Sequence, residues 1–142
     1  MKYLLSALTA LLLFTTAIAQ KPAANAKPTE VIKFDKTEYD FGTIVQNKPV
    51  SYNFIFKNIS KAPVVIENAT ASCGCTTPEW VKTPIMAKKG STIKAGFNAA
   101  APGVFDKTIT VKIQGQQLPV ELRIKGKVVA AEEFAKLPAK SK

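Results

Sequence analysis

The sequence predicts an immunoglobulin-like β-sandwich of seven to eight strands that follows a cleaved signal peptide. Apolar residues between positions 30 and 128 recur with a period of two rather than that of a helix. Clusters of turn-forming residues separate these segments at intervals of about one strand. No helical pattern interrupts the strands, so they are expected to pair in two stacked, mainly antiparallel sheets.

The first 19 residues have the composition of a secretory signal peptide. Lys2 supplies a basic start, an apolar run from Leu4 to Phe14 follows, and Ala17-Ile18-Ala19 supplies a cleavage site. The apolar run is shorter than the roughly 18 to 20 residues that a membrane-spanning helix needs. We therefore expect a mature protein without a transmembrane segment and with a periplasmic or secreted location.

Basic segments flank the predicted domain. We expect residues 20–29 to form a flexible Lys/Pro/Ala linker, residues 30–128 the sandwich, and residues 129–142 a flexible basic tail, in which Ala130–Leu137 shows a weak helical period. The chain has 20 basic and 10 acidic side chains, a balance that permits weak contact with an anionic surface. The basic residues are scattered and match no DNA- or RNA-binding motif, so nucleic acid is not expected as a partner.

The first half of the domain contains three expected strands. Val31–Phe34 and Tyr39–Val45 are rich in β-branched and aromatic residues, but they are short or irregular. The third strand is more regular. Tyr52, Phe54 and Phe56 alternate with polar residues, which places three aromatic rings on one face.

The second half supplies four more strands. Val64–Thr70 and Thr92–Asn98 are the less regular candidates. Thr108–Ile113 and Leu118–Ile124 alternate strictly between apolar and polar residues. The short connection Gln114–Gln117 is expected to join these last two strands as a hairpin.

The composition argues against most catalytic classes. The chain contains no histidine, which rules out Ser-His and Cys-His catalytic pairs and imidazole-bound metals. Asp35, Glu38 and Asp40 form an acidic cluster that a hydrolase would need. Their position on or beside a strand of a basic domain instead favours surface ion pairs. We therefore expect no enzymatic activity.

The segment from Cys73 to Trp80 is the chemically distinctive part of the sequence. Cys73 and Cys75 are the 2 cysteines of the chain, and in an exported protein they are expected to form a local disulfide. A regular strand would hold their side chains about 7 Å apart. Gly74 is therefore expected to adopt backbone angles closed to other residues, so that the chain can curl into a small ring. Such a ring stabilises a fold by only about 1.5 kcal/mol in the chain-entropy model.

Other interpretations of this motif remain open. In one, the two cysteines act as a redox-active dithiol; in another, they bind Cu(I) as thiolates with Met86 as a thioether ligand. Trp80, the single tryptophan, fits either an exposed contact or a core residue below the cysteine turn. Together with Cys73–Thr76, it defines the expected interaction loop for a protein partner in the cell envelope.

Several motifs in combination resemble a family of secreted bacterial domains of unknown function, a DUF family related to the ASH and major-sperm-protein-like immunoglobulin folds. The resemblance rests on Phe41-Gly42-Thr43-Ile44, on Ala71–Thr76 with Trp80, and on Gly103–Val111, and it covers about residues 30 to 128. It implies a sandwich of seven or eight strands outside the cytoplasm with no assigned enzymatic activity. The family supplies no catalytic residues.

The sequence leads to two hypotheses of function. The first is a non-enzymatic exported domain, without a cofactor, that acts as a binding or scaffolding module in the cell envelope. The alternative is a redox-active or Cu(I)-binding periplasmic protein that uses the Cys73-Gly74-Cys75 motif.

Overall fold

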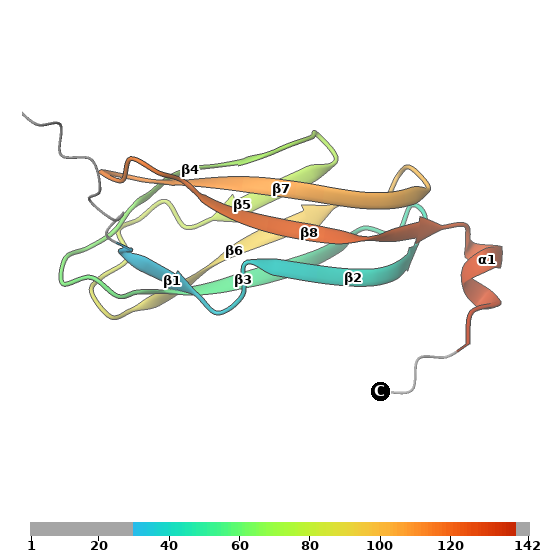
Figure 1. Cartoon of the computed structure of the whole chain (residues 1–142), viewed down its shortest axis with the longest axis horizontal. Helices are drawn as coiled ribbons and strands as arrows, with labels where there is room; N and C mark the ends of the chain where they lie inside the picture. Colours follow the sequence, from blue (N-terminus) through green and yellow to red (C-terminus); the bar gives the residue numbers. More distant parts are fainter. Residues whose placement is uncertain (1–29, 139–142) are drawn as a thin grey trace, which may run out of the picture.

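Two four-stranded sheets face each other across an apolar core in the computed structural model (Figure 1). The structure describes residues 30–138, so the predicted signal peptide and linker lie outside the described residues. The first sheet contains, in spatial order, β1 (Ile32–Phe34), β3 (Val50–Asn58), β6 (Gly90–Phe97) and β5 (Thr76–Trp80). The second contains β2 (Glu38–Val45), β8 (Val120–Val129), β7 (Gly103–Ile113) and β4 (Ile66–Ala71).

The amino-terminal strand is divided between the two sheets. β1 pairs antiparallel with β3, whereas β2 crosses to the second sheet and pairs parallel with β8. The remaining pairs in both sheets are antiparallel. This is the immunoglobulin-like strand order with its first strand split. The predicted sandwich of seven to eight strands is confirmed, with eight strands.

The core follows from the alternation seen in the sequence. Inward-facing side chains of the central strands are fully buried, among them Phe54, Phe56, Ile93, Ile109, Val111, Leu122 and Ile124. Aromatic rings also join the two sheets: Phe97 stacks on Phe105 with centroids 4.1 Å apart, and Tyr39 stacks on Tyr52 at 3.7 Å. Each large apolar side chain buried in this way contributes about 1.5–3 kcal/mol, so the sheets are held together by packing.

The sequence does not predict strand β5, since it places Thr76–Trp80 in the expected interaction loop. Its sequence lacks an apolar alternation and contains Pro78, two features that argue against a strand. β5 lies at the edge of its sheet and pairs only with β6. A proline is tolerated there, since the outer side of an edge strand has no ladder bonds to lose.

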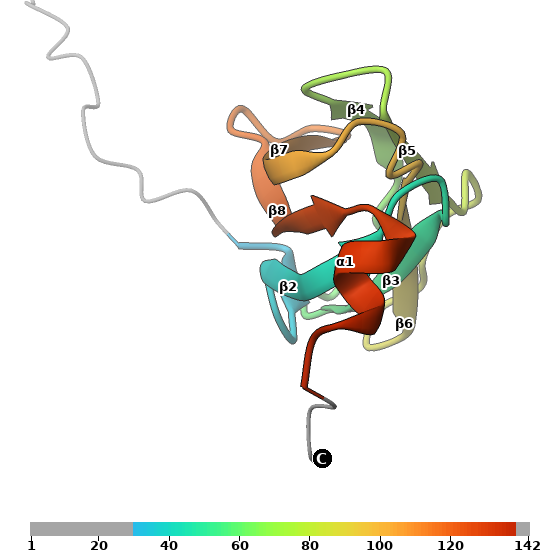
Figure 2. The same cartoon turned by 90° about the vertical axis from the view of Figure 1, so that its right-hand side faces the viewer.

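The carboxyl-terminal boundary also differs from the prediction. Val129, assigned to the flexible tail, is the buried last residue of β8, and its carbonyl accepts a hydrogen bond of 2.8 Å from the amide of Gln46. A short helix, α1 (Ala131–Ala135), follows at that end of the sandwich (Figure 2). Within residues 30–138, no helix has the length and apolar character needed to cross a membrane.

Candidate functional site

The cysteine turn, residues 72–75, lies where the chain crosses from one sheet to the other. β4 ends at Ala71 on the edge of the second sheet, and β5 begins at Thr76 on the edge of the first. Figure 2 shows this connection projecting beside β4. The turn is therefore a corner of the sandwich, and both edge strands depend on its path.

Cys73 and Cys75 are joined by a disulfide, with their Cα atoms 5.3 Å apart. Both residues are half-buried, whereas Gly74 between them is exposed. The hydroxyl of buried Thr76 lies 3.7 Å from Sγ of Cys73 and 3.9 Å from Sγ of Cys75. The amide of Thr76 also donates to the carbonyl of Cys73 at 3.3 Å, which closes the turn. Thr76 thus supports the disulfide from the core side.

The expectation that Gly74 adopts a backbone conformation reserved for glycine is wrong with respect to the left-handed region. The described glycines with positive φ are Gly42, Gly103 and Gly115, and Gly74 is not among them. A Cβ atom built on Gly74 would meet nothing within 4 Å. The two cysteines approach each other because the whole segment leaves the strand as a turn.

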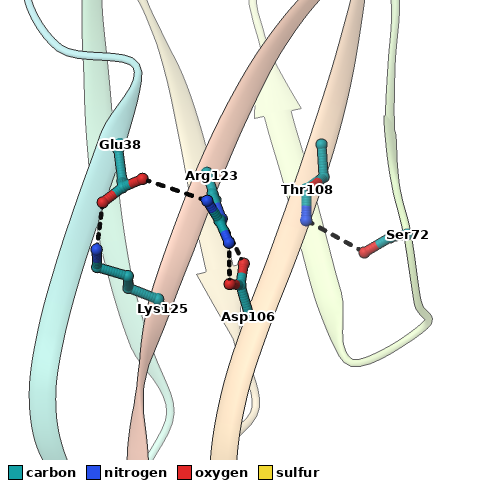
Figure 3. Close-up of polar contacts among 6 residues, drawn as sticks. All are labelled: Glu38, Ser72, Asp106, Thr108, Arg123 and Lys125. Carbon is teal, nitrogen blue, oxygen red and sulfur yellow. Dashed lines mark hydrogen bonds and ion pairs between the residues drawn. The ribbon is translucent and has the colours of Figure 1, made fainter.

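Main-chain hydrogen bonds fix the cysteine turn to both sheets. The amide of Ser72 donates to the carbonyl of Thr108 in β7 at 2.9 Å, and Oγ of Ser72 accepts from the amide of Thr108 at 3.2 Å (Figure 3). On the other side, the carbonyl of Cys75 accepts from the amide of Asn98, which follows β6, at 3.1 Å. The turn is held at both ends, with exposed Gly74 at its tip.

The crossing at the cysteine turn uncovers part of the edge of β7. Ser72 directly follows β4 and is the last residue of this segment that forms hydrogen bonds with β7, where its partner is Thr108. Because strand backbones alternate with a period of two, the main-chain groups of Asp106 and Val104 face the same side as those of Thr108. Within residues 30–138, no hydrogen bond reaches them from that side. Val104 at this edge is 83% exposed.

Trp80, at the end of β5, ties the two edge strands together. Its side chain is half-buried against the core, and Nε1 donates to the carbonyl of Ile66 in β4 at 3.2 Å. Nζ of Lys82 lies 6.0 Å from the ring centroid on the exposed side. The indole therefore closes the seam between β4 and β5 at the ends of these strands that lie away from the cysteine turn. The structure does not bring Trp80 into one loop with Cys73–Thr76, as the sequence predicted.

Met86 is not brought near the cysteines. β6 runs from Gly90, close to Met86, to Phe97, which pairs with Thr76 next to the cysteine turn. Seven strand steps separate the two regions by roughly 23 Å. Cys73, Cys75 and Met86 thus do not form a common ligand set. Within the described part of the chain, no group of three or more His, Cys, Asp or Glu residues is placed to hold a metal ion.

Of the acidic cluster near β2, Glu38 meets basic partners on the outer surface of the second sheet, whereas Asp35 and Asp40 form no ion pair within residues 30–138. Glu38 pairs with Lys125 and, at 3.7 Å, with Arg123, which also forms a two-pronged contact with Asp106 (Figure 3). The hydrogen bond that Arg123 donates holds the pKa of Asp106 below its ordinary value, and the bond that Lys125 donates to Glu38 raises the pKa of Lys125. Of the rest of the cluster, Asp40 accepts from the amide of Gly42 at 2.7 Å.

Asn58 is a structural residue that the sequence did not single out. It is completely buried at the end of β3, where its Nδ2 donates to the carbonyls of Ala62 at 2.8 Å and Ile85 at 2.9 Å. Its Oδ1 accepts from the amide and hydroxyl of Ser60. A single side chain thus joins the β3–β4 loop to the segment before β6. A buried polar residue in an otherwise exposed turn has no sequence signature of its own.

Solved structures share this fold at low sequence identity. The ASH/PapD-like domain of human CEP192 has a TM-score of 0.63 and 9% identity, with 89% of this chain and 98% of that chain covered. A protein of unknown function from Porphyromonas gingivalis W83 has a TM-score of 0.59 and 15% identity, covering 76% of this chain and 51% of that chain. The secreted serine protease VesC from Vibrio cholerae has a TM-score of 0.55 and 12% identity, covering 80% and 27%.

These likenesses establish the fold alone, since all three identities are low. The chain spans about half the length of the Porphyromonas gingivalis protein. No curated protein matches the chain in sequence. A family model described as a protein of unknown function, DUF1573, matches residues 32–128, almost the whole predicted sandwich. The resemblance inferred from the sequence motifs is therefore confirmed: the chain belongs to the DUF1573 family and has an ASH-related immunoglobulin-like fold.

Proposed function

We propose that this chain is a non-enzymatic, exported module that binds a protein partner in the cell envelope. The binding surface is the open edge of β7 beside the cysteine turn. The observation that carries this proposal is the open edge of β7 at Val104 and Asp106, next to Cys73–Cys75. An unpaired strand edge binds an extended segment of another chain through main-chain hydrogen bonds. The exposed isopropyl group of Val104 adds an apolar contact at the same place.

The cysteine turn gives this edge its shape. A flexible β4–β5 connection could fold back over β7 and cover the unpaired groups. The bonds from Ser72 to Thr108 and from Asn98 to Cys75 hold the connection in its path across the corner. The disulfide further restricts residues 73–75. In this proposal the two cysteines are positioning residues for the binding edge, and they carry out no redox chemistry themselves.

Catalysis is not part of this proposal. Glu38 and Asp106 are the carboxylates that a catalytic role would use. Both form ion pairs with Arg123 or Lys125 on an open sheet surface. A general acid or base needs a perturbed pKa near the working pH. The arginine shifts the pKa of Asp106 in the opposite direction.

Site-specific photo-crosslinking in cells that express the protein tests the binding edge. A photo-reactive residue at position 74 has open space around it, since nothing lies within 4 Å of a Cβ atom there. We expect a discrete cross-linked product from this position. Val104→Pro should remove it, because proline deletes the outward-facing amide while the bonds between β7 and β8 remain.

Val104→Thr is the matched control, since it keeps the amide and a β-branched side chain and should retain the product. The same photo-reactive residue at exposed Asn53, on the outer face of the first sheet, should give no such product. The proposal is refuted by a product that survives Val104→Pro, by the same product from position 53, or by no product from position 74.

A further inference from the structure

Five unpaired lysines gather at the end of the sandwich opposite the cysteine turn. We call this region the lysine end and define it by its exposed lysines, which are Lys33, Lys57, Lys61, Lys88 and Lys89. None of them takes part in an ion pair with a carboxylate of residues 30–138. Lys94 and Lys112, on the flanks of the sandwich, do have acidic partners.

The strand register and the loops bring these lysines together. Lys33 is the cross-strand neighbour of Lys57 on the outer face of the first sheet. The main chain of Asn58 bonds to both Lys88 and Lys89, at 3.0 and 2.9 Å. The buried Asn58 side chain then orders the loop that carries Lys61. The positive charges are therefore fixed around one buried residue.

The same end exposes large apolar side chains. Met86 is 57% exposed in the turn before β6, where its carbonyl accepts from the amide of Lys89 at 3.0 Å. Leu118 is 61% exposed in the β7–β8 hairpin. It borders an open, mainly apolar depression of about 220 Å³ that extends to Val31 and Ile32 at the start of β1. Lysines and apolar loop tips thus share one surface.

We infer that the lysine end docks on the surface of a bilayer that contains anionic phospholipid. Lysine ammonium groups are attracted to lipid phosphates, and apolar side chains among them enter the boundary between headgroups and acyl chains. A soluble polyanion could pair with the lysines, but it would not bury the apolar side chains of Met86 and Leu118. Glu30 lies at this end, and Glu67 lies close to it but is paired with Lys112, so the five unpaired lysines leave the surface positive.

Chain connectivity supports the same orientation. The described chain begins at Glu30, beside the lysine end, because Ile32 pairs with Asn58. The sequence that joins the domain there contributes Lys21 and Lys27. With this end on a bilayer, the cysteine turn and the open edge of β7 face away from the membrane. The lysine end shares no residue with the proposed partner-binding edge, so either surface can bind without the other.

Co-sedimentation with lipid vesicles tests this inference on the chain from Gln20 onward. The vesicles contain phosphatidylcholine either alone or with phosphatidylglycerol. We expect binding only to the anionic vesicles and a loss of binding in high salt. Lys61→Glu with Lys89→Glu should weaken partitioning at least about 25-fold, since each lysine near an anionic surface contributes a factor of about 5. Neither side chain makes a hydrogen bond within the described chain, so the fold should be unaffected.

The charge-matched control is Lys48→Glu with Lys136→Glu, which changes the same net charge at the opposite end and should leave partitioning nearly unchanged. Met86→Ser with Leu118→Ser should weaken it roughly 10-fold at constant charge. Equal binding to neutral vesicles, or an equal loss in both lysine pairs, would overturn the inference. Binding of soluble polyphosphate that depends on Lys61 and Lys89, with no vesicle effect of Met86 and Leu118, would overturn it in favour of a polyanion site.

Discussion

The lysine end and the cysteine turn are both sets of connections between strands, yet different chemistry holds them in place. At the lysine end, the buried Asn58 side chain bonds to Ser60, Ala62 and Ile85 and so joins two separate segments. At the cysteine turn, a disulfide closes a ring across a sequence separation of 2 residues. The first arrangement fixes distant parts of the chain, whereas the second fixes its own local path.

This difference shows why a visible covalent link is a poor guide to what stabilises a fold. Closing a very short loop removes little entropy from the unfolded chain. A buried amide that loses its hydrogen-bond partners, or leaves partners unsatisfied, costs more. The lysine end should therefore matter more for stability, and the cysteine turn more for the shape of the neighbouring surface.

The largest expected effect is at the lysine end. Asn58→Ala should lower the free energy of unfolding by about 3 kcal/mol, since it removes the four hydrogen bonds of a fully buried side chain and leaves the carbonyl of Ile85 with the amide of Val64 as its remaining donor. Urea denaturation followed by circular dichroism measures this change. Asn68→Ala is the control, since Asn68 is exposed and bonds only to Thr70 at 3.0 Å. A loss below about 1 kcal/mol for Asn58→Ala would remove the contrast between the two ends.

A smaller effect is expected at the cysteine turn. Cys73→Ser together with Cys75→Ser should cost about 1.5 kcal/mol, which is the loop entropy of so short a ring. Gly74→Ala should change stability little, because the added methyl group has open space around it. Denaturation of both variants, with intact mass before and after reduction of the native chain, checks the result. A cost that equals or exceeds that of Asn58→Ala would reverse the ranking, and a native mass unchanged by reduction would exclude the disulfide.

The sequence predicted the central strands well, because their side chains alternate strictly. Tyr52–Phe56 lies within β3, and the expected strands Thr108–Ile113 and Leu118–Ile124 overlap β7 and β8. Leu118 itself lies in the hairpin before β8, and both strands are longer than the alternation indicated. The pattern could not predict β5, whose residues are set by pairing with β6 and not by their own alternation. It also gave no sign that β2 would pair parallel with β8, since that register depends on contacts between residues more than 80 positions apart.

The sequence singles out the cysteines of the candidate site but does not predict their surroundings. Cys73 and Cys75 stand out in any sequence, but the open edge of β7 exists only because β4 leaves its sheet at Ala71. Gly126 is a second feature that the sequence does not predict. A Cβ atom there would lie 2.7 Å from the carbonyl oxygen of Gly42 and 2.8 Å from the ring of Phe105, a close approach that only the folded chain reveals.

The smallest expected effect concerns the flank between the two ends, where charges are paired, in contrast to the unpaired lysine end. Arg123→Gln should raise the pKa of Asp106 toward its ordinary value, because the hydrogen bond from Arg123 is the main cause of its lowering. A carboxyl with a lowered pKa stabilises the fold above its ordinary pKa, and that stabilisation is lost as the pH falls through the lowered value. The effect on stability should be slight, since both side chains are about half exposed.

Titration of the Asp106 carboxyl by NMR in the native chain and in Arg123→Gln measures the shift, with Lys61→Gln as a control that should leave it unchanged. If the Asp106 pKa is the same in all three proteins, the ion pair between Arg123 and Asp106 does not form in solution, and the contrast between the paired flank and the lysine end is lost.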